Sequence, residues 1–238
     1  MTIPRREEER FALYWTPPQG SPLALRGAAW LGHDAAGEAS GERPAVDGFD
    51  VARLAALTAA PAQYGLHATL KPPFRLAEGT DRAGLEAAIA AFAGTVGAFA
   101  VPPLRLAALD GFLALIPSGP SAALDALAAR CVKEFDRFRR PAGPDELARR
   151  RAAGLSARQE RHLLDWGYPY VLEDFRFHVT LTGALSQEDA ARLMPALSAE
   201  FAEVIGAPLE IAELALFVQP GPKAPFVEHG RFALAQRR

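Results

Sequence analysis

The amino-acid sequence predicts an α/β (α+β) fold made of two related halves. The phrase His-x-Thr-Leu occurs twice, at 67–70 and 178–181, and each copy lies in an apolar frame typical of a β-strand. Each copy is followed by the same order of elements, a helix and then two strands. Because strands and helices alternate along the chain, we expect a single bilobal domain over 1–238, with pseudo-twofold halves at about 11–135 and 165–238.

In the first half, a strand and two helical stretches precede the motif strand. We expect a strand at Phe11–Thr16, a short helix at 21–32, a surface loop at 33–48, a helix at Val51–Ala59 and the motif strand at Tyr64–Lys71. Proline pairs remove backbone donors and so end both strands, at Pro17–Pro18 and at Pro72–Pro73.

The segment after the first motif carries a helix start and a hairpin turn. Thr80 and Asp81 form a plausible N-cap for a helix over about 81–97. Asp110-Gly111 separates two apolar runs, at Leu104–Leu109 and Gly111–Ile116, and this dipeptide is a strong hairpin signal. The order strand, helix, strand, strand is therefore complete in the first half.

The second half repeats this order after intervening helical material. An amphipathic helix is expected at Ser121–Phe138, followed by a helical insert at about 139–165 whose second helix opens with the capping-box pattern Ser156–Gln159. Beyond the second motif we expect a helix capped by Ser186 over about 187–205, then strands at Leu209–Gln219 and Phe226–Ala235.

The insert is rich in arginine. From Arg137 to Arg161 there are eight Arg residues against the three acids Asp145, Glu146 and Glu160. Two interpretations remain open: a solvated helical face, or a basic lid above an anionic substrate.

Composition excludes several classes of protein. The net charge of −2 and the pI of about 6.2 lack the basic surplus that proteins gripping long nucleic acid need, so a small substrate is favoured. Cys131 is the only cysteine, which excludes an intramolecular disulfide, and we expect it to be a buried thiol. There is neither an apolar leader nor an 18-residue apolar run. We expect a cytoplasmic monomer without membrane contact.

The two motif strands each present one row of side chains to a common site. Alternate residues of a strand point to the same side, so His and Thr project together while the apolar residues between them project to the other side. The rows are Gly65, His67, Thr69 and Lys71 in the first strand, and Arg176, His178, Thr180 and Thr182 in the second. Each row holds an imidazole, a hydroxyl and a cation.

Two imidazoles facing one site suit a reaction that removes a proton from one oxygen and gives a proton to another. Hydrolysis of a phosphodiester is such a reaction, and the hydroxyls and cations would stabilise the phosphoryl oxygens. No metal or cofactor is then required. A metal site completed by His229 is a weaker alternative, because a catalytic zinc needs three protein ligands and the usual motifs are absent. We expect His162 on the surface of the insert and His33 in a polar loop.

Longer phrases around the motifs resemble the two-histidine (2H) phosphoesterase superfamily and, more closely, its branch associated with phosphonate metabolism. These phrases are Tyr64–Phe74, Gly167–Tyr170, Arg176–Gly183, Leu216–Pro220 and Tyr14–Pro18. The resemblance implies two mainly antiparallel sheets flanked by helices around a central cleft, and metal-independent hydrolysis of a phosphodiester, often a cyclic one. It gives catalytic roles to the two His/Thr pairs of the motifs, which are His67, Thr69, His178 and Thr180.

The resemblance leaves the substrate open. The branch points by association toward a ribose 1,2-cyclic phosphate, an intermediate of phosphonate breakdown. Candidate substrate-binding residues are Lys71, Arg176 and Thr182 in the two rows, and Tyr14, Tyr64 and Tyr168, for which a packing role is equally compatible. We therefore expect a phosphoric diester hydrolase acting on a small phosphorylated substrate. The alternatives are a non-catalytic module that binds a phosphorylated ligand or an RNA end, and an enzyme that processes RNA ends.

Overall fold

A computed structural model describes residues 8–38 and 42–236, and its strands form three antiparallel sheets. The largest has the order β2–β1–β8–β9, formed by Ala68–Phe74, Arg10–Trp15, Glu213–Gln219 and Val227–Ala233. A second has the order β4–β5–β6, formed by Leu104–Leu109, Phe112–Pro117 and Val179–Thr180. The third pairs β3 (Phe99–Val101) with β7 (Leu209–Ile211). The expected mixed fold with antiparallel sheets is confirmed.

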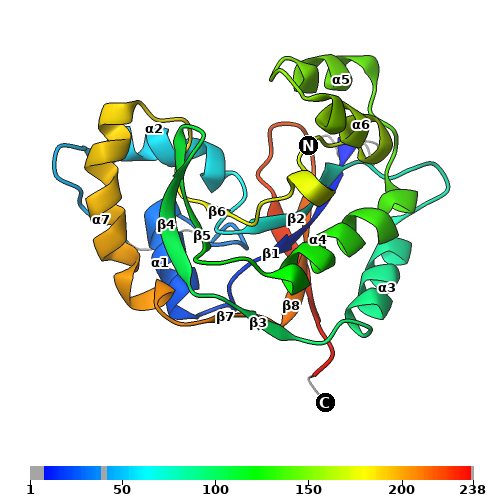
Figure 1. Cartoon of the computed structure of the whole chain (residues 1–238), viewed down its shortest axis with the longest axis horizontal. Helices are drawn as coiled ribbons and strands as arrows, with labels where there is room; N and C mark the ends of the chain where they lie inside the picture. The colour runs from blue at the N-terminus through cyan, green and yellow to red at the C-terminus, as the bar shows by residue number, and fades with distance from the viewer. Residues whose placement is uncertain (1–7, 39–41, 237–238) are drawn as a thin grey trace.

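Helices pack against the two larger sheets and give the molecule two lobes (Figure 1). Helices α3 (Arg82–Ala93) and α4 (Ala122–Glu134) contact the β2–β1–β8–β9 sheet. Helix α7 (Gln187–Ile205) contacts β4 and β5, and it also packs on α1 (Pro22–Leu31), which in turn packs on α2 (Val51–Ala62). Each described α-helix begins at a Ser or Asp whose side chain accepts a backbone N–H, apart from the α-helix that starts at Pro144.

Each of the larger sheets combines strands from both halves of the chain. Strand β1 pairs with β2 on one side and with β8 on the other, while β5 pairs with β4 and with β6. The two lobes are therefore interleaved in sequence. The motif strands β2 and β6 each lie at the edge of a sheet, which leaves one side of each motif unpaired by a neighbouring strand in that sheet.

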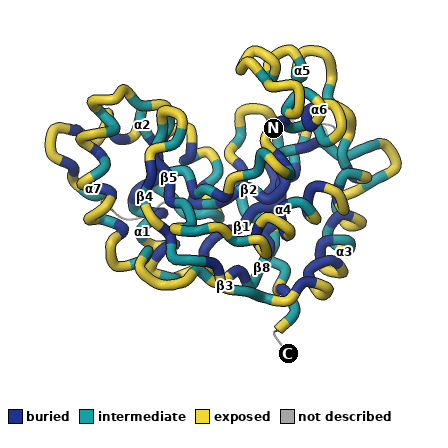
Figure 2. Tube along the Cα trace, viewed as in Figure 1, coloured by how far each residue is buried: buried dark blue, intermediate teal, exposed yellow. Residues whose placement is uncertain are grey.

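The apolar residues of the two motifs belong to the hydrophobic core, as expected from strand alternation. Leu66, Ala68 and Leu70 are buried around the first motif, and the counterparts Phe177, Val179 and Leu181 are buried around the second. In Figure 2 the buried segments follow the strands at the middle of the molecule, and the outer helical faces are exposed. Burial of these side chains holds both motif strands in place, at about 1.5–3 kcal/mol for each large side chain.

The first motif strand does not end where the sequence predicts. Strand β2 runs through Pro72 and Pro73 to Phe74, whereas proline was expected to stop it at Lys71. A proline is tolerated in an edge strand because its missing N–H can face away from the sheet. The edge position of β2 therefore explains the difference.

The arginine-rich insert forms two helices above the rest of the molecule, α5 (Pro144–Arg151) and α6 (Ala157–Trp166) (Figure 1). Helix α5 has no buried residue, and α6 begins with the expected capping box. Several insert arginines form ion pairs, so their charges are engaged by acids of the protein itself. These pairs are Arg150–Glu146, Arg151–Glu160, Arg158–Asp174 and Arg139–Asp136.

Candidate functional site

The two motif histidines share the same local hydrogen bond. Nδ1 of His67 lies 2.9 Å from the carbonyl oxygen of Gly65, and Nδ1 of His178 lies 2.8 Å from the carbonyl oxygen of Arg176. A carbonyl oxygen only accepts, so Nδ1 is the protonated nitrogen in each neutral ring. Nε2 of each imidazole is left as the atom that can accept or release a proton.

Gly65, whose carbonyl binds His67, has a backbone conformation that favours glycine. Its φ is +67°, a conformation that residues with a Cβ rarely adopt, and a Cβ there would lie 2.9 Å from Cα of Ala35. In the second motif Arg176 supplies the equivalent carbonyl. The rows thus differ in side chain at this position but share the backbone acceptor that orients the ring.

His67 lies against an aromatic wall. Its ring centroid is 4.2 Å from that of Tyr14, 5.2 Å from that of Tyr64 and 6.4 Å from that of Phe217. Burial lowers the pKa of His67 to about 4 against the opposing effect of the hydrogen bond to Gly65, and the charge of a protonated His178 contributes to the lowering. The two imidazoles therefore lie within electrostatic reach of each other.

His178 has more open surroundings. Its ring contacts that of Phe112, the first residue of β5, at a centroid distance of 5.7 Å. The environments of the two imidazoles therefore differ, although their local hydrogen bonds match.

The motif threonines are half-buried, Thr69 opposite Tyr14 on β1 and Thr180 opposite Ala114 on β5. Within 8–38 and 42–236, neither hydroxyl has a hydrogen-bond partner. Both are therefore free to bind a ligand oxygen.

Lys71 does not lie in the row of His67, contrary to expectation. The pairing register shifts between Leu13 and Tyr14 of β1, so that Tyr14 opposes Thr69 while Leu13 opposes Lys71. This β-bulge moves Lys71 to the core face. Its Nζ donates to the carbonyl of Val132 at 2.9 Å and lies 3.6 Å from Oδ1 of Asp136. Burial lowers the pKa of Lys71 to about 8.

Two members of the second row also differ from expectation. Thr182 is 1% exposed, and its hydroxyl accepts the backbone N–H of Leu113 at 2.9 Å. This bond extends the pairing of β5 beyond the short strand β6, so Thr182 is structural. The side chain of Arg176 is 74% exposed and lies 3.9 Å from Asp110, out in solvent. Of this row, His178 and Thr180 remain as residues that can act on a ligand.

The three tyrosines proposed from the sequence occupy different positions. Tyr14 is buried beneath His67, and burial raises the pKa of its hydroxyl. Tyr64 is half-buried and contacts both Tyr14 and Phe226. Tyr168 lies under the guanidinium of Arg150, 4.9 Å from ring centroid to Cζ. Tyr14 and Tyr64 line the His67 side of the site, and Tyr168 connects it to the insert.

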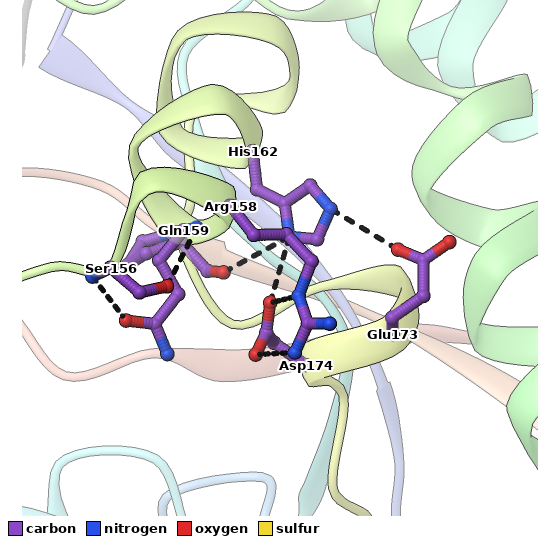
Figure 3. Close-up of polar contacts among 7 residues, drawn as sticks. Ser156, Arg158, Gln159, His162, Glu173 and Asp174 are labelled. Carbon is purple, nitrogen blue, oxygen red and sulfur yellow. Dashed lines mark hydrogen bonds and ion pairs between the residues drawn. The ribbon is translucent and has the colours of Figure 1, made fainter.

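His162 was expected on the surface, but it is buried at the joint between the insert and the second motif (Figure 3). Its Nε2 lies 3.2 Å from Glu173 and its Nδ1 lies 3.3 Å from Asp174. Asp174 also accepts two hydrogen bonds of 2.8 Å from Arg158. These contacts attach α6 to the η3 turn (Leu172–Asp174), which shortly precedes the second motif in the chain.

The alternative metal site finds no support in the geometry of His229. Its Nε2 is 2.8 Å from Glu86, on α3, in a surface pair. Across the described ranges, no group of three or more His, Cys, Asp or Glu side chains is arranged to hold a metal ion. Cys131 is buried as expected, and burial raises its pKa to about 12.

Sequence reasoning missed the residues that extend the site along β1. Arg10 lies on the same face as Tyr14, four residues earlier, and its Cζ is 5.2 Å from the ring centroid of Phe226. Extending the row of alternate residues from Tyr14 back to Arg10 would have identified it. The aromatic residues Phe217 and Phe226 come from the C-terminal part of the chain and carried no local signal.

Known proteins share this sequence and, more distantly, this fold. Residues 69–227 match the family described as "Protein of unknown function (DUF1045)". Two relatives are named ribose 1,5-bisphosphate phosphokinase PhnN. The one from Janthinobacterium sp. (strain Marseille) is 42% identical over 93% of this chain, and the one from Laribacter hongkongensis (strain HLHK9) is 37% identical over 91%. The chain spans about half the length of these relatives, 50% of each.

Two solved structures also resemble the chain, a phosphoesterase at 13% identity and E. coli LigT complexed with 3′-AMP at 17%. Each alignment covers 97% of this chain and 100% of the other, with a TM-score of 0.43, which is too low to carry an argument about function. No described helix has the length and apolar character that crossing a membrane requires.

Proposed function

The chain belongs to the DUF1045 family, and from the geometry of its two histidines we propose that it is a metal-independent phosphodiesterase that hydrolyses a small cyclic phosphodiester. One observation carries the proposal. In each motif Nδ1 of the imidazole is bound to the carbonyl two residues earlier, which leaves Nε2 available, and the charge of His178 acts on His67. Among the described residues, neither motif threonine hydroxyl has a hydrogen-bond partner. One imidazole can therefore accept a proton, the other can donate one, and the two hydroxyls can contact the oxygens of an anion.

The reaction balances with these groups and water alone. A neutral imidazole takes a proton from water as the water oxygen bonds to phosphorus. The P–O bond to one ester oxygen breaks, and the other imidazole, initially protonated, gives its proton to the leaving alkoxide. The product is a phosphomonoester with one free hydroxyl. Proton exchange with solvent then restores both rings.

The surroundings of the rings support His67 as the base and His178 as the acid. His67 lies against the tilted rings of Tyr14 and Tyr64, and a ring with a pKa of about 4 is neutral at pH 7 and able to accept a proton. An anionic phosphodiester beside it would raise that pKa toward the working range, because a negative charge favours the imidazolium. The proton for the leaving group must then come from His178, which has the more open surroundings.

The names of the relatives favour a ribose phosphate as substrate. A ribose 1,2-cyclic phosphate that also carries a 5-phosphate yields ribose 1,5-bisphosphate when the bond from phosphorus to O2 breaks, and this is the compound in the relatives' printed name. Phosphorylation is not part of the proposal, because the chain has no Gly-Lys step and hence no Gly-x-x-x-x-Gly-Lys loop. The proposed reaction would supply the substrate of such a kinase.

Turnover of a panel of cyclic phosphates tests this function. The panel contains ribose 1,2-cyclic phosphate with and without a 5-phosphate, and nucleoside 2′,3′-cyclic phosphates, all assayed with a chelator present. We expect turnover of at least one compound. The variants His67→Ala and His178→Ala should each lose about 10²–10⁴-fold in kcat, the contribution typical of a general acid or base.

His229→Ala is the matched control, because His229 forms a surface pair with Glu86. It should keep full activity, and circular dichroism should show that all three variants are folded. Full activity of either motif variant, or loss of activity on chelation, would contradict the proposal. Tight binding of the cyclic phosphates without turnover would favour the alternative of a binding module.

A further inference from the structure

A cavity of about 320 Å³ lies between the insert and the strand that carries Tyr14, and four arginines, Arg10, Arg75, Arg139 and Arg140, are among its lining residues. Its volume is in the range of ligand pockets. From these residues we propose that Arg10 and Arg75 form a subsite for a second phosphoryl group of the substrate. The inference rests on the proposed function, because it specifies which phosphodiesters the histidines receive.

Among the described residues, Arg10 and Arg75 form no ion pair, and Glu146 acts on Arg10 only from beyond ion-pair distance. Arg139 is neutralised by Asp136, with bonds of 2.7 and 3.2 Å, and Glu146 is engaged by Arg150. Arg10 and Arg75, by contrast, have no ion-pair partner among residues 8–38 and 42–236. A half-buried cation without an acid is costly unless something compensates it. An anionic ligand is the compensation that these two side chains lack.

The Arg10 guanidinium is held in place by neutral groups. Its Nε donates to Oε1 of Gln219 at 2.6 Å, and its Cζ lies over the ring of Phe226. Gln219 is 2% exposed, and its own amide nitrogen donates to the carbonyl of Ala224 at 2.7 Å. This chain of bonds fixes the position of a charge without neutralising it, which is how a preorganised anion site is built.

The two cations also act on each other. Burial lowers the pKa of Arg10, and the positive charge of the nearby Arg75 lowers it too, against the opposing effects of Tyr64, Tyr14 and Glu146. Arg75 makes no side-chain hydrogen bond within the described part of the chain. The Nη donors of Arg10 and the side-chain donors of Arg75 are thus left without a hydrogen-bond partner among the described residues, and guanidinium donors match the oxygens of a phosphoryl group.

The cavity and the histidines lie on one continuous face. Arg10 and Tyr14 project from the same side of β1, four residues or about 13 Å apart along the strand. Phe226 contacts Arg10 at one end, and Tyr14 and Tyr64 at the other, and both tyrosines contact His67. A sugar on the tyrosines would direct a cyclic phosphate toward the imidazoles and a terminal phosphate toward Arg10.

A larger cavity of about 820 Å³ does not show the same character. It lies around the loop before α3, and its lining includes the acids Glu9, Glu78, Asp81 and Glu86 with only Arg82 and Arg140 as cations. Arg82 is already paired with Glu9 at 2.8 Å. That surface does not favour an anion, so the arginine cavity beside β1 is the better subsite.

The test compares two substrates that share one cyclic diester, ribose 1,2-cyclic phosphate with and without a 5-phosphate. In Arg75→Gln, KM for the 5-phosphorylated compound should rise about ten- to hundred-fold, the loss of a charge-assisted contact. KM for the other compound should stay unchanged. Arg10→Lys should give a smaller rise, because it keeps the charge but loses the fork. Arg105→Gln, which changes an exposed arginine on β4, is the matched control and should alter neither KM.

Direct binding separates failure of the subsite from failure of the proposed function. By calorimetry, ribose 5-phosphate should bind to His67→Ala as it does to the unmodified protein, and binding should be lost in Arg75→Gln. This result without turnover of any cyclic ester would support the subsite and overturn the phosphodiesterase. If the unmodified protein turned over both esters with the same KM, and Arg75→Gln left both KM values unchanged, the subsite would be overturned and the phosphodiesterase would stand.

Discussion

The two motif histidines are oriented by main-chain carbonyls, and no carboxylate of residues 8–38 or 42–236 takes part. In each motif Nδ1 bonds to the carbonyl two residues earlier, so the local chain that places the ring also sets its tautomer. A carboxylate partner would stabilise the imidazolium, whereas a neutral carbonyl leaves the proton affinity to the wider surroundings. Those surroundings differ, with an aromatic wall around His67 and open space around His178. One motif can therefore serve two opposite roles in proton transfer.

The buried His67 should make folding stability depend on pH. Its pKa is about 4 in the folded protein against 6.5 ordinarily. Between these values the unfolded chain binds more protons, so stability falls as pH drops from 6.5 to 4 and is unaffected by this group above 6.5. The total loss is at most about 3 kcal/mol. Urea unfolding between pH 7 and 4 should show a steeper loss for the unmodified protein than for His67→Gln, and parallel curves would contradict the burial of the ring.

Strand alternation predicted the central residues of the site and failed at the ends of the rows. His, Thr and the apolar residues between them lie as expected, because two or three residues of regular strand suffice to place them. Lys71 lies beyond a β-bulge, which shifts the alternation by one residue. Thr182 lies beyond the end of a strand only two residues long. Bulges and short edge strands depend on the partner strand, which local sequence does not specify.

Helix α1 connects the two motifs and shows what the sequence could not reveal. Gly27 packs against the side chain of Leu66, next to His67, and Nε1 of Trp30 donates to the carbonyl of Leu181 at 2.8 Å. The sequence indicated a short helix here but not what it contacts, because both contacts are distant along the chain. This helix fixes the relative position of two strands that belong to different sheets.

Gly27→Ala should disturb the site through this helix. A Cβ at position 27 would overlap the side chain of Leu66, and overpacking of this kind costs about 1–3 kcal/mol. Leu66 would have to shift, and His67 with it, so kcat/KM should fall as well as the melting temperature. Gly206→Ala is the control, because φ there is −80° and no atom lies within 4 Å of the added Cβ. That variant should be as stable as the unmodified protein, and an equally stable Gly27→Ala with full activity would contradict the role of α1.

The whole molecule is interleaved, although its sequence is arranged as two successive halves. The order of elements in each half was predicted well, because it depends on local periodicity and turn residues. The pairing of β1 with β8 and of β5 with β6 joins residues more than 60 positions apart, and no local pattern indicates it. The candidate site likewise combines residues from both ends of the chain, because the ring of His67 contacts those of Tyr14 and Phe217.

Neither sequence half should therefore fold alone. A fragment of 1–135 lacks β8, which pairs with the whole inner edge of β1, and it also lacks β6 and α7, so both sheets and both cores are left open. A fragment of 136–238 keeps the β8–β9 pair but lacks β1 and β5, against which β8 and β6 also pair. Circular dichroism should show no cooperative thermal transition for either fragment, while the full chain should unfold in a single urea transition with the same midpoint by fluorescence and by circular dichroism. Because the candidate site draws on both fragments, their co-expression should restore the proposed phosphodiesterase activity only if the strands reassemble. A cooperative transition in the isolated 1–135 fragment would show instead that the halves are independent units.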